Sequence, residues 1–360
     1  MAPLLGGFNP NSLHAEGRAA RAAVDSAREA VARVLGAAPR EIVFTGGGSE
    51  SVVLAILGAA RAAVARGRHV VTVATEHHAV LHAVDVLERD GWRVTRLPVD
   101  PRGLVDPAAF AAALTPETTL ASVMLANNEI GVVQPVAELA RIARERGVLL
   151  HTDAVQAPGW LPLDVDALGV DLLSLSAHKF YGPKGVGVLY VRRGTALEPL
   201  IVGGGQEHGL RAGTENVAGI AGLAAALTLA ESDRPVAAPR VAPLRDRLEA
   251  GIVAAVTDVV VNAGEAPRLP GILSVAFGGV PSDALLIRLD LEGVAASAGS
   301  ACAAGSLEPS HVAAALGLGE RYQLGVVRFS LGRDTTAAEI EDVIHRLVAI
   351  MASMGTPLVV

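Results

Sequence analysis

The sequence predicts an α/β fold: a large domain with a mostly parallel sheet flanked by helices, followed by a smaller α+β domain. In the first half of the chain, short β-branched runs alternate with alanine-rich amphipathic runs such as residues 18–37. Strands that alternate with helices form parallel sheets covered by helices on both faces. After residue 191 this alternation stops, and 360 residues are enough for two domains.

Apolar runs bounded by turn residues mark the expected strands. In the large domain they are residues 41–45, 69–75, 93–99, 119–125, 147–154, 171–177 and 185–191. In the smaller domain, strands are expected near residues 259–263, 271–278 and 326–332, and helices near residues 283–291 and 336–351.

A change of pattern near residue 232 predicts the domain boundary. A glycine-rich loop, GGGQEHGLRAGTEN, leads into a helical run that ends near residue 231. The next stretch, SDRPVAAP at residues 232–239, is interpreted as a linker because prolines and polar residues interrupt the helical pattern. We therefore expect a large domain over residues 15–231 and a small domain formed by residues 1–14 and 232–360.

Composition argues against several kinds of partner. The longest apolar run, residues 219–230, is shorter than the roughly 20 residues that cross a bilayer, so no membrane partner is expected. The 30 Lys and Arg residues are scattered and the formal net charge is −7, which argues against direct binding of nucleic acid. The N-terminus shows no basic leader, which predicts a cytoplasmic protein, and a single cysteine excludes an internal disulfide.

A lysine directly follows the strand expected at residues 171–177, within SAHKFYGPKG. Open parallel sheets place their ligand crevice at the carboxyl ends of strands. Ser176 and His178 put polar groups beside Lys179, and the glycines and proline that follow favour a tight turn. A lone lysine in a turn is usually a surface residue. A lysine held partly out of water is instead suited to forming a Schiff base.

A second expected strand, GVLLHTDA, ends near Asp153, with Gln156 three residues later. An aspartate in an apolar strand needs a partner, either a structural group such as an arginine or a cationic ring nitrogen. Pyridoxal phosphate pairs a carboxylate with its ring nitrogen and a lysine with its aldehyde. Asp153 and Lys179 together therefore point to this cofactor.

The segment EIVFTGGGSES predicts an anion cradle, because a strand and three glycines precede Ser49 at the start of a helix. Backbone N–H groups and the helix dipole favour a phosphate there, although a plain turn explains the glycines about as well. The motif TEHHAV places His77 after another strand. Such a histidine either stacks on an aromatic cofactor or has a structural role.

Cys302, the only cysteine, lies in SAGSACAAGS at residues 297–306, where no large apolar side chain occurs. A solitary cysteine is usually a buried and inert hydrophobe. The glycines on both sides favour a different interpretation, a mobile loop that carries its thiol to a cofactor and then to an outside acceptor.

In combination, these motifs resemble the cysteine desulfurases, pyridoxal-phosphate enzymes of the class V aminotransferase family. The resemblance runs from NPNSLH to the C-terminal helix. Its motifs, in order, are TGGGSES, TEHHAV, NNEIGVVQP, HTDAVQ, SAHKFYGPKG, GGGQEHGLRAGTEN, SAGSACAAGSLEPSHV and VRFSLGR. It implies the type I fold of pyridoxal-phosphate transferases. The stretch after Cys302 resembles the group with a long mobile cysteine loop.

The resemblance implies a role for each matching residue. Lys179 binds the aldehyde of the cofactor, Asp153 its ring nitrogen and Gln156 its ring hydroxyl, while His77 stacks on the ring and accepts a proton. The implied phosphate ligands are Gly48, Ser49, Ser176, His178 and, across a homodimer interface, Thr214. Asn128 and Arg328 are implied to bind the substrate carboxylate, and Cys302 to accept sulfur.

The implied reaction converts L-cysteine to L-alanine and leaves the sulfur on Cys302 as a persulfide. An acceptor, such as an iron–sulfur scaffold or a tRNA-thiolation protein, would then receive it. Three departures from the family pattern stand out. No opening strand with an Ala-Thr-Thr-type turn precedes MAPLLGGFNP, so we expect weaker cofactor binding than in a chain extended upstream; Ser49 replaces a threonine, and His208 replaces an arginine near the expected dimer interface.

Other functions stay open on the sequence alone. A metal hydrolase would draw on His77, His78, His151, Asp153 and His178, but these lie on separate segments without a close ligand spacing, and we expect no metal. A related pyridoxal-phosphate lyase or aminotransferase, for example one acting on selenocysteine, is a second alternative. A catalytically poor relative that binds a partner is a third.

Overall fold

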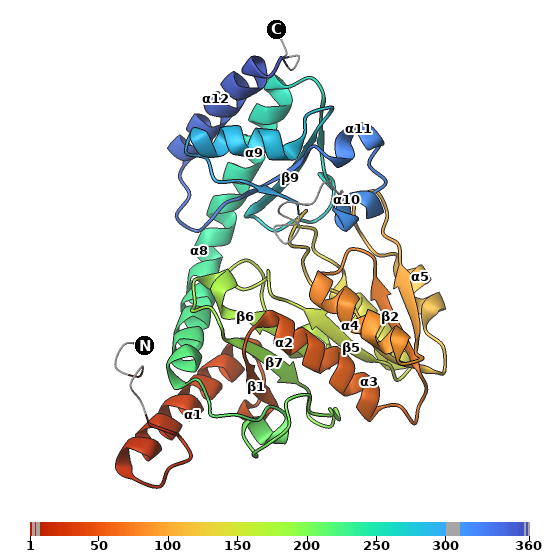
Figure 1. The fold of residues 1–360 in the computed structure, drawn as a ribbon, viewed down its shortest axis with the longest axis vertical. Coiled ribbons are helices and arrows are strands. Elements are labelled where there is room, and N and C mark those ends of the chain that lie inside the picture. The colour runs from red at the N-terminus through yellow and green to blue at the C-terminus, as the bar shows by residue number, and fades with distance from the viewer. Residues whose placement is uncertain (2–3, 5–7, 300–309, 356–357, 359–360) are drawn as a thin grey trace. The chain divides into compact units, whose positions relative to one another are not determined.

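The computed structural model describes the chain except residues 2–3, 5–7, 300–309, 356–357 and 359–360. The predicted mobile loop around Cys302 therefore lies outside the described residues. By their internal contacts, the residues form two compact units (Figure 1). The first unit comprises Met1–Leu97, Asp106–Leu125 and Gln134–Arg234, and the second comprises Pro98–Val105, Ala126–Val133 and Pro235–Val360.

This grouping differs from the expected domains at two places. The segment with residues 1–14 belongs to the first unit, and two short segments, residues 98–105 and 126–133, belong to the second. The chain thus crosses between the units more often than a single boundary near residue 232 implies. The expected division into 15–231 and 1–14 with 232–360 concerns domains and stays a prediction.

A seven-stranded sheet forms the centre of the first unit. Its strands are β1 (Ile42–Thr45), β2 (His69–Val73), β3 (Arg93–Leu97), β4 (Thr118–Ser122), β5 (Leu149–Asp153), β6 (Leu172–Ser176) and β7 (Gly187–Val191). Their order across the sheet is β1-β7-β6-β5-β4-β2-β3. Only β7 runs antiparallel to its neighbours, β1 and β6, while the other neighbours pair in parallel. The predicted α/β class with a mostly parallel sheet is confirmed.

Helices cover this sheet. They are α1 (Ala15–Leu35), α2 (Gly48–Val53), α3 (Ala59–Ala62), α4 (His78–Arg89), α5 (Pro107–Ala113), α6 (Val136–Glu145) and α7 (Val165–Leu168). A π-helical turn, Leu54–Gly58, joins α2 to α3. Buried aliphatic side chains of these two helices, of the π-helical turn and of α4, among them Ile56 and Leu87, pack on strand residues such as Leu120 and Leu172.

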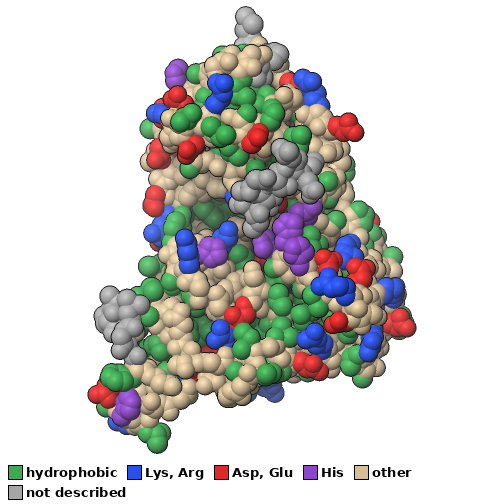
Figure 2. Space-filling view, in the orientation of Figure 1, with side chains coloured by type: hydrophobic (Ala, Val, Ile, Leu, Met, Phe, Trp, Pro, Cys, Tyr) green, Lys and Arg blue, Asp and Glu red, His purple; other side chains and the backbone are tan. Residues whose placement is uncertain are grey.

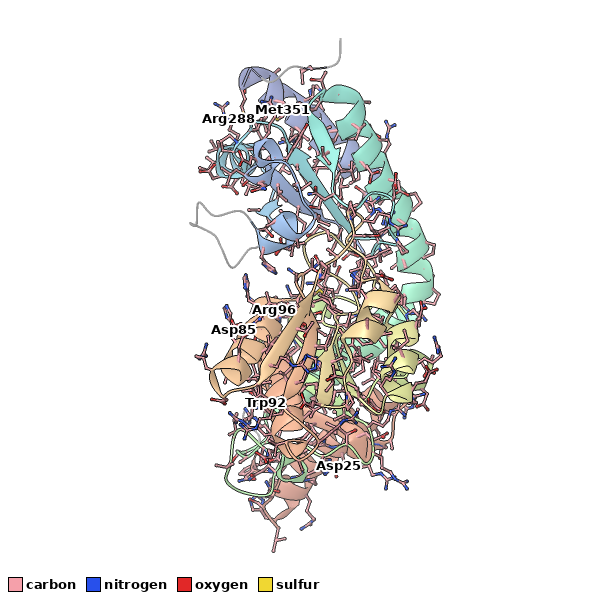
Figure 3. The ribbon with its side chains drawn as sticks, turned by 90° about the vertical axis from the view of Figure 1, so that its right-hand side faces the viewer. Asp25, Asp85, Trp92, Arg96, Arg288 and Met351 are labelled. Carbon is pink, nitrogen blue, oxygen red and sulfur yellow. The ribbon has the colours of Figure 1, made fainter. Side chains whose placement is uncertain are left out.

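An ion pair links α4 to the edge strand β3. Arg96 Nη2 lies 2.6 Å from Asp85 Oδ1 (Figure 3). The same Nη2 lies 2.9 Å from Glu88 Oε2. Exposed positions occur along β3, whereas every residue of β2, β4, β6 and β7 is buried. Buried strands of this kind read as continuous apolar runs, which is why the sequence predicted them.

The second unit is a smaller α+β structure, as expected. Its antiparallel sheet has the order β10-β11-β9-β8 and contains β8 (Val259–Val261), β9 (Ile272–Phe277), β10 (Ser297–Ala298) and β11 (Val326–Ser330). Its helices include α9 (Ser282–Leu291), α10 (His311–Ala315), α11 (Glu320–Gln323) and α12 (Ala337–Ser353).

The linker predicted at residues 232–239 is wrong, because α8 runs without interruption over Val217–Ala255. The helix contains Pro235, Pro239 and Pro243, each of which removes a backbone donor. Since these prolines recur every four residues, their rings and missing N–H groups share one side of the helix. Burial of side chains such as Val241 and Leu248 stabilises the helix against this local cost.

Acidic and basic side chains are intermixed on the face shown in Figure 2. Within the described part of the chain, no helix combines the length and the apolar character needed to cross a bilayer.

Candidate active site

Two neighbouring strands of the first unit end in polar residues that the sequence singled out. Asp153 is the last residue of β5 and Ser176 the last of β6, and the two strands pair in parallel. Asp153 is only 6% exposed, and its Oδ1 accepts the N–H of Val155 at 2.9 Å. The carboxyl ends of β5 and β6 therefore hold a buried acid where a parallel sheet places its ligands.

Burial controls the ionisation of Asp153. Removal from water raises the pKa of Asp153 to about 6, against the opposing effects of the Val155 N–H and the positive charge of Lys179. A second cation beside this carboxyl would favour its ionised form. A protonated ring nitrogen is such a cation.

Lys179 lies in a short 3-10 turn, Ala177–Phe180, that follows β6 directly. Both Lys179 and His178 are exposed. The Oγ of Ser176 and the Nδ1 of His178 form a hydrogen bond of 3.0 Å. Partial removal from water, and then the charges of Lys179 and Lys184, lower the pKa of His178 and favour its neutral ring.

The glycine turn before α2 lies against the ends of these strands. Gly47 has φ 149°, which favours glycine. A Cβ on Gly48 would lie 3.1 Å from Ser176 Cβ and from Val155 Cγ2, so glycine permits this close approach. The first N–H groups of α2 have no acceptor within the helix, as in phosphate-binding turns. Ser49, in this turn, is exposed.

Glu50 and Arg211 support this turn, and neither was among the predicted site residues. Glu50 Oε2 accepts the N–H of Gly46 at 2.8 Å, and Arg211 Nε donates to Glu50 Oε1 at 2.9 Å. The pair thus joins the start of the glycine turn to the loop of residues 203–216.

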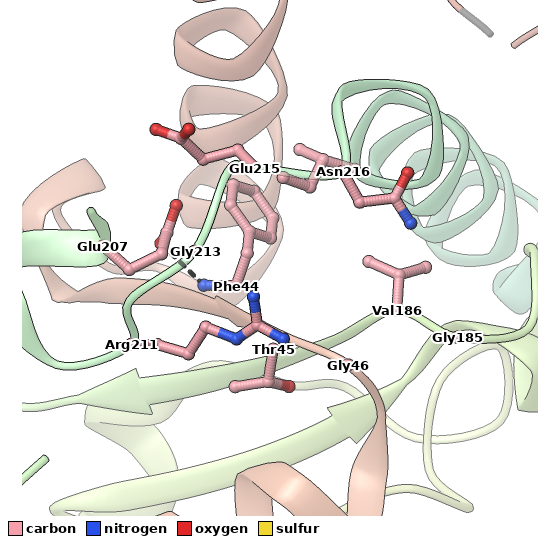
Figure 4. Close-up of a pocket in the computed structure, with 11 residues that line it drawn as sticks. Phe44, Thr45, Gly46, Gly185, Val186, Glu207, Arg211, Gly213, Glu215 and Asn216 are labelled. Carbon is pink, nitrogen blue, oxygen red and sulfur yellow. Dashed lines mark hydrogen bonds between the residues drawn. The ribbon is translucent and has the colours of Figure 1, made fainter. Parts of the chain in front are cut away.

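That loop is also held by a buried ion pair. Glu207 accepts from Arg28 at 2.7 and 2.9 Å and from the N–H of Phe44 at 2.8 Å. Figure 4 shows Glu207, Phe44 and Arg211 around a small cavity of about 40 Å³. His208 has φ 62°, an uncommon left-handed conformation for a side chain other than glycine. Thr214, later in the loop, is exposed.

His77 caps the N-terminus of α4, since its Nδ1 accepts the N–H of Ala79 at 3.1 Å. A neutral His77 with this bond carries its proton on Nε2. The preceding residue, Glu76, is fully buried and accepts the N–H of Met124 at 2.6 Å. Burial first, and also the charge of Asp153, hold the pKa of Glu76 well above its usual range, so a neutral acid lies near Asp153.

Two residues that are predicted to bind the substrate lie in contact in the second unit. Arg328, on β11, donates from Nη1 to the carbonyl of Asn128 at 2.9 Å and to that of Gly299 at 3.3 Å. Arg328 Nε is buried and has no hydrogen-bond acceptor among the described residues. Burial lowers the pKa of Arg328, opposed by the charge of Glu129.

The structure thus brings together Gly48, Asp153, Ser176, His178 and Lys179 in the first unit, and Asn128 with Arg328 in the second. Gln156 is half-buried close after β5. Three acidic residues that were not predicted as site residues, Glu50, Glu76 and Glu129, lie within the sequence motifs, but only the fold shows how far each is buried and what it contacts. Among the described residues, no group of three or more His, Cys, Asp or Glu side chains is placed to hold a metal ion.

The residues of the first unit fit pyridoxal phosphate. A buried carboxyl beside a lysine charge suits a cationic ring nitrogen and an aldehyde. A turn that packs closely against Ser176 and Val155 at Gly48, followed by a helix start, suits a phosphate.

Comparisons with known proteins give a consistent result. The sequence profile of the class-V aminotransferases matches residues 7–343. Two similar curated proteins are cysteine desulfurase IscS of Dictyoglomus turgidum, 48% identical over 94% of this chain and 87% of the relative, and that of Anaeromyxobacter sp. (strain Fw109-5), 49% identical over 93% and 83%.

Solved structures agree with these matches. A NifS-like protein superposes with a TM-score of 0.89 at 37% identity, covering 96% of this chain and 92% of its own. SspA in complex with cysteine superposes with a TM-score of 0.81, also at 37% identity, covering 93% and 94%.

Proposed function

Because this chain belongs to the class-V aminotransferase family and is a pyridoxal-phosphate-dependent cysteine desulfurase, we propose that Lys179, Asp153 and Cys302 carry its reaction. Its fold is the type I fold of pyridoxal-phosphate enzymes. The alternatives, a selenocysteine-type lyase, another aminotransferase or a catalytically poor relative, are not favoured, since the matched relatives are named cysteine desulfurases.

The buried Asp153 beside Lys179 is the observation that supports this proposal most. Pyridoxal phosphate, when bound, draws electrons from the α-carbon of an amino acid. Asp153 would hold a proton on the ring nitrogen, Gln156 would bind the ring hydroxyl and His77 would stack on the ring. The turn at Gly48 and Ser49, with Ser176 and His178, binds the phosphate.

The residues of this chain divide the proton and sulfur chemistry among them. Lys179 would bind the aldehyde of the cofactor, and its free amine would move the α-proton of the substrate. Asn128 and Arg328 bind the substrate carboxylate, and the orphaned Nε of Arg328 is a donor for it. The thiolate of Cys302 forms an S–S bond with the substrate sulfur as the C–S bond breaks, and alanine leaves with a proton in place of sulfur.

The hydrogen bond that His77 makes at Nδ1 restricts the proton transfers that were expected of it from the sequence. Its Nδ1 accepts the α4 cap bond, so the neutral ring presents an N–H at Nε2. In this state His77 donates a proton or hydrogen bond at Nε2. His77 accepts a proton only after its Nε2 proton has left, or after its Nδ1 has released the N–H of Ala79.

Replacing Asp153 with asparagine tests the central observation. In the cofactor-free protein, the raised pKa of Asp153 means that the folded state holds its proton more tightly than the unfolded chain. Protonated Asp153 therefore stabilises the folded state most below pH 3.8, its usual pKa. This stabilisation is lost as the pH rises through about 6 and the side chain ionises. The cofactor-free D153N variant, whose side chain does not ionise, should therefore be more stable than cofactor-free wild type at pH 7, by on the order of 3 kcal/mol.

Cofactor binding should change in the opposite direction. The amide of the D153N variant cannot carry the charge that pairs with a protonated ring nitrogen, so the dissociation constant should rise about 10- to 100-fold. Urea unfolding from pH 4 to 8 and equilibrium dialysis against the cofactor measure the two effects. If D153N bound the cofactor like wild type, the proposed pairing would be wrong.

We further propose that the protein is a homodimer in which Thr214 of the partner subunit binds the cofactor phosphate. Thr214 is exposed on a loop that the Arg28–Glu207 and Arg211–Glu50 pairs hold in place. Sedimentation should show a dimer, and T214V should raise the cofactor dissociation constant about tenfold by removing one hydrogen bond to a charged group. T214S, which keeps the hydroxyl, is the control. A monomer that holds the cofactor at full occupancy would exclude a shared site, and His208 would then be the first interface residue to revert to arginine.

The delivery of sulfur completes the proposal. An acceptor protein, either an iron–sulfur scaffold or a tRNA-thiolation protein, takes the persulfide sulfur from Cys302 in the cytoplasm. The curated name IscS of the matched relatives favours iron–sulfur assembly.

A further inference from the structure

One oxygen atom in the second unit lies against both ends of the cysteine segment. Residues 300–309, which include Cys302, are flanked by Gly299 and Ser310. Ser310 Oγ donates a hydrogen bond to Glu129 Oε2. The same Glu129 Oε2 lies only 2.6 Å from where a Cβ on Gly299 would be. A single carboxylate therefore contacts the residue before this segment and the residue after it.

Glu129 is itself held firmly. It is 3% exposed, and the Oδ1 of Asn127 accepts the N–H groups of Glu129 and Ile130 at 2.8 and 2.9 Å. The N–H of Asn127 in turn donates to the carbonyl of Val132 at 2.9 Å, which closes the turn. A carboxylate fixed at its backbone and buried at its tip can serve as an anchor for other segments.

Both flanking residues have further attachments nearby. The carbonyl of Gly299 accepts from Arg328 Nη1 at 3.3 Å, and Ser310 caps α10 by accepting the N–H of Val312 at 3.1 Å. Burial raises the pKa of Glu129, while the Ser310 hydroxyl and the charges of His311 and Arg328 oppose that rise. The Arg328 guanidinium on β11 thus offsets part of the cost of burying the carboxylate.

We propose that Glu129 is a positioning residue for Cys302, which ties the two ends of the cysteine segment together. This inference rests on the proposed function of Cys302. Fixing both ends of a ten-residue segment limits the positions its thiol can take. Sulfur transfer needs the thiolate in line with the substrate C–S bond, and a displacement of about 1 Å can cost about 100-fold in rate.

Because Cys302 is the only thiol, its alkylation by iodoacetamide reports on this segment alone. E129A should raise the alkylation rate several-fold, measured at the high-pH plateau where the thiol is fully ionised and its pKa no longer matters. The rate of alanine formation should fall at least about tenfold. The visible band of the bound cofactor should be unchanged, and E265A, an exposed glutamate of the same unit, is the charge control.

The G299A variant disturbs the contact between Gly299 and Glu129 without removing a charge. Gly299 does not have the left-handed backbone that excludes alanine, and its other close neighbours, Ser310 Cβ and Val326 Cγ1, lie at an ordinary 3.5 Å. The new methyl group should therefore push mainly against Glu129 Oε2 and displace it from Ser310. G299A should match E129A in both measurements, and the double variant should be no faster in alkylation than E129A alone.

Plateau alkylation rates equal to wild type in both E129A and G299A would overturn this inference, as would independent, additive effects of the two changes. G299A keeps every side chain of the anchor, so the test remains decisive if E129A folds poorly. Failure of the proposed function is recognised separately, because C302S would then still form alanine at the wild-type rate whatever the alkylation data show.

Discussion

Replacing Cys302 with serine is expected to abolish sulfur transfer while leaving the cofactor bound. Serine is nearly the same size, but its hydroxyl is not ionised at neutral pH and cannot accept sulfur as a persulfide. Alanine formation from L-cysteine should fall at least about 10³-fold, as expected when a nucleophile is removed. Alanine and sulfide assays with a visible spectrum on the same sample measure both outcomes.

The C302S variant separates the two halves of the reaction. None of the cofactor ligands proposed in the first unit changes, so L-cysteine should still alter the visible spectrum. Because the chain has no other cysteine, no second thiol can take over the sulfur. Alanine formation at the wild-type rate would show that Cys302 is incidental to the reaction.

Replacing Lys179 with alanine is expected to have the opposite effect. The covalent link to the aldehyde and the base that moves the α-proton are lost together, while Cys302 remains. General acid–base catalysis contributes about 10²- to 10⁴-fold, and the activity should fall by at least that factor. Borohydride reduction of the wild-type protein followed by peptide mass spectrometry should place the cofactor on Lys179.

The sequence provides a matched control for this experiment. Lys184 is the only other lysine of the chain, and it lies exposed in the same SAHKFYGPKG segment. K184A should keep the visible band and most of the activity. Borohydride-stable cofactor on Lys184, or an unchanged K179A, would contradict the assignment.

Much of the fold was predictable because its strands are buried. A parallel strand covered on both sides appears in the sequence as a short apolar run, so all seven strands of the first sheet were located. Helix α8 was not predicted through residues 232–239, because Pro235 and Pro239 argue locally against a helix. Side-chain burial along α8 decided otherwise, and burial against distant segments does not appear in a local pattern.

The sequence by itself determined which residue types are available for the chemistry, and hence the family, the cofactor and the activity. Motifs show which residue types occur and in what order, and the proposed reaction requires a lysine, an aspartate and a cysteine. The individual roles of Lys179, Asp153 and Cys302 stay predictions. Only the tertiary structure decided that Glu76 is a buried acid near Asp153, that Glu50 joins the glycine turn to Arg211, and that Glu129 contacts both Gly299 and Ser310. The physical reason is that the ionisation and the contacts of a side chain depend on how far folding removes it from water and on which distant segments surround it.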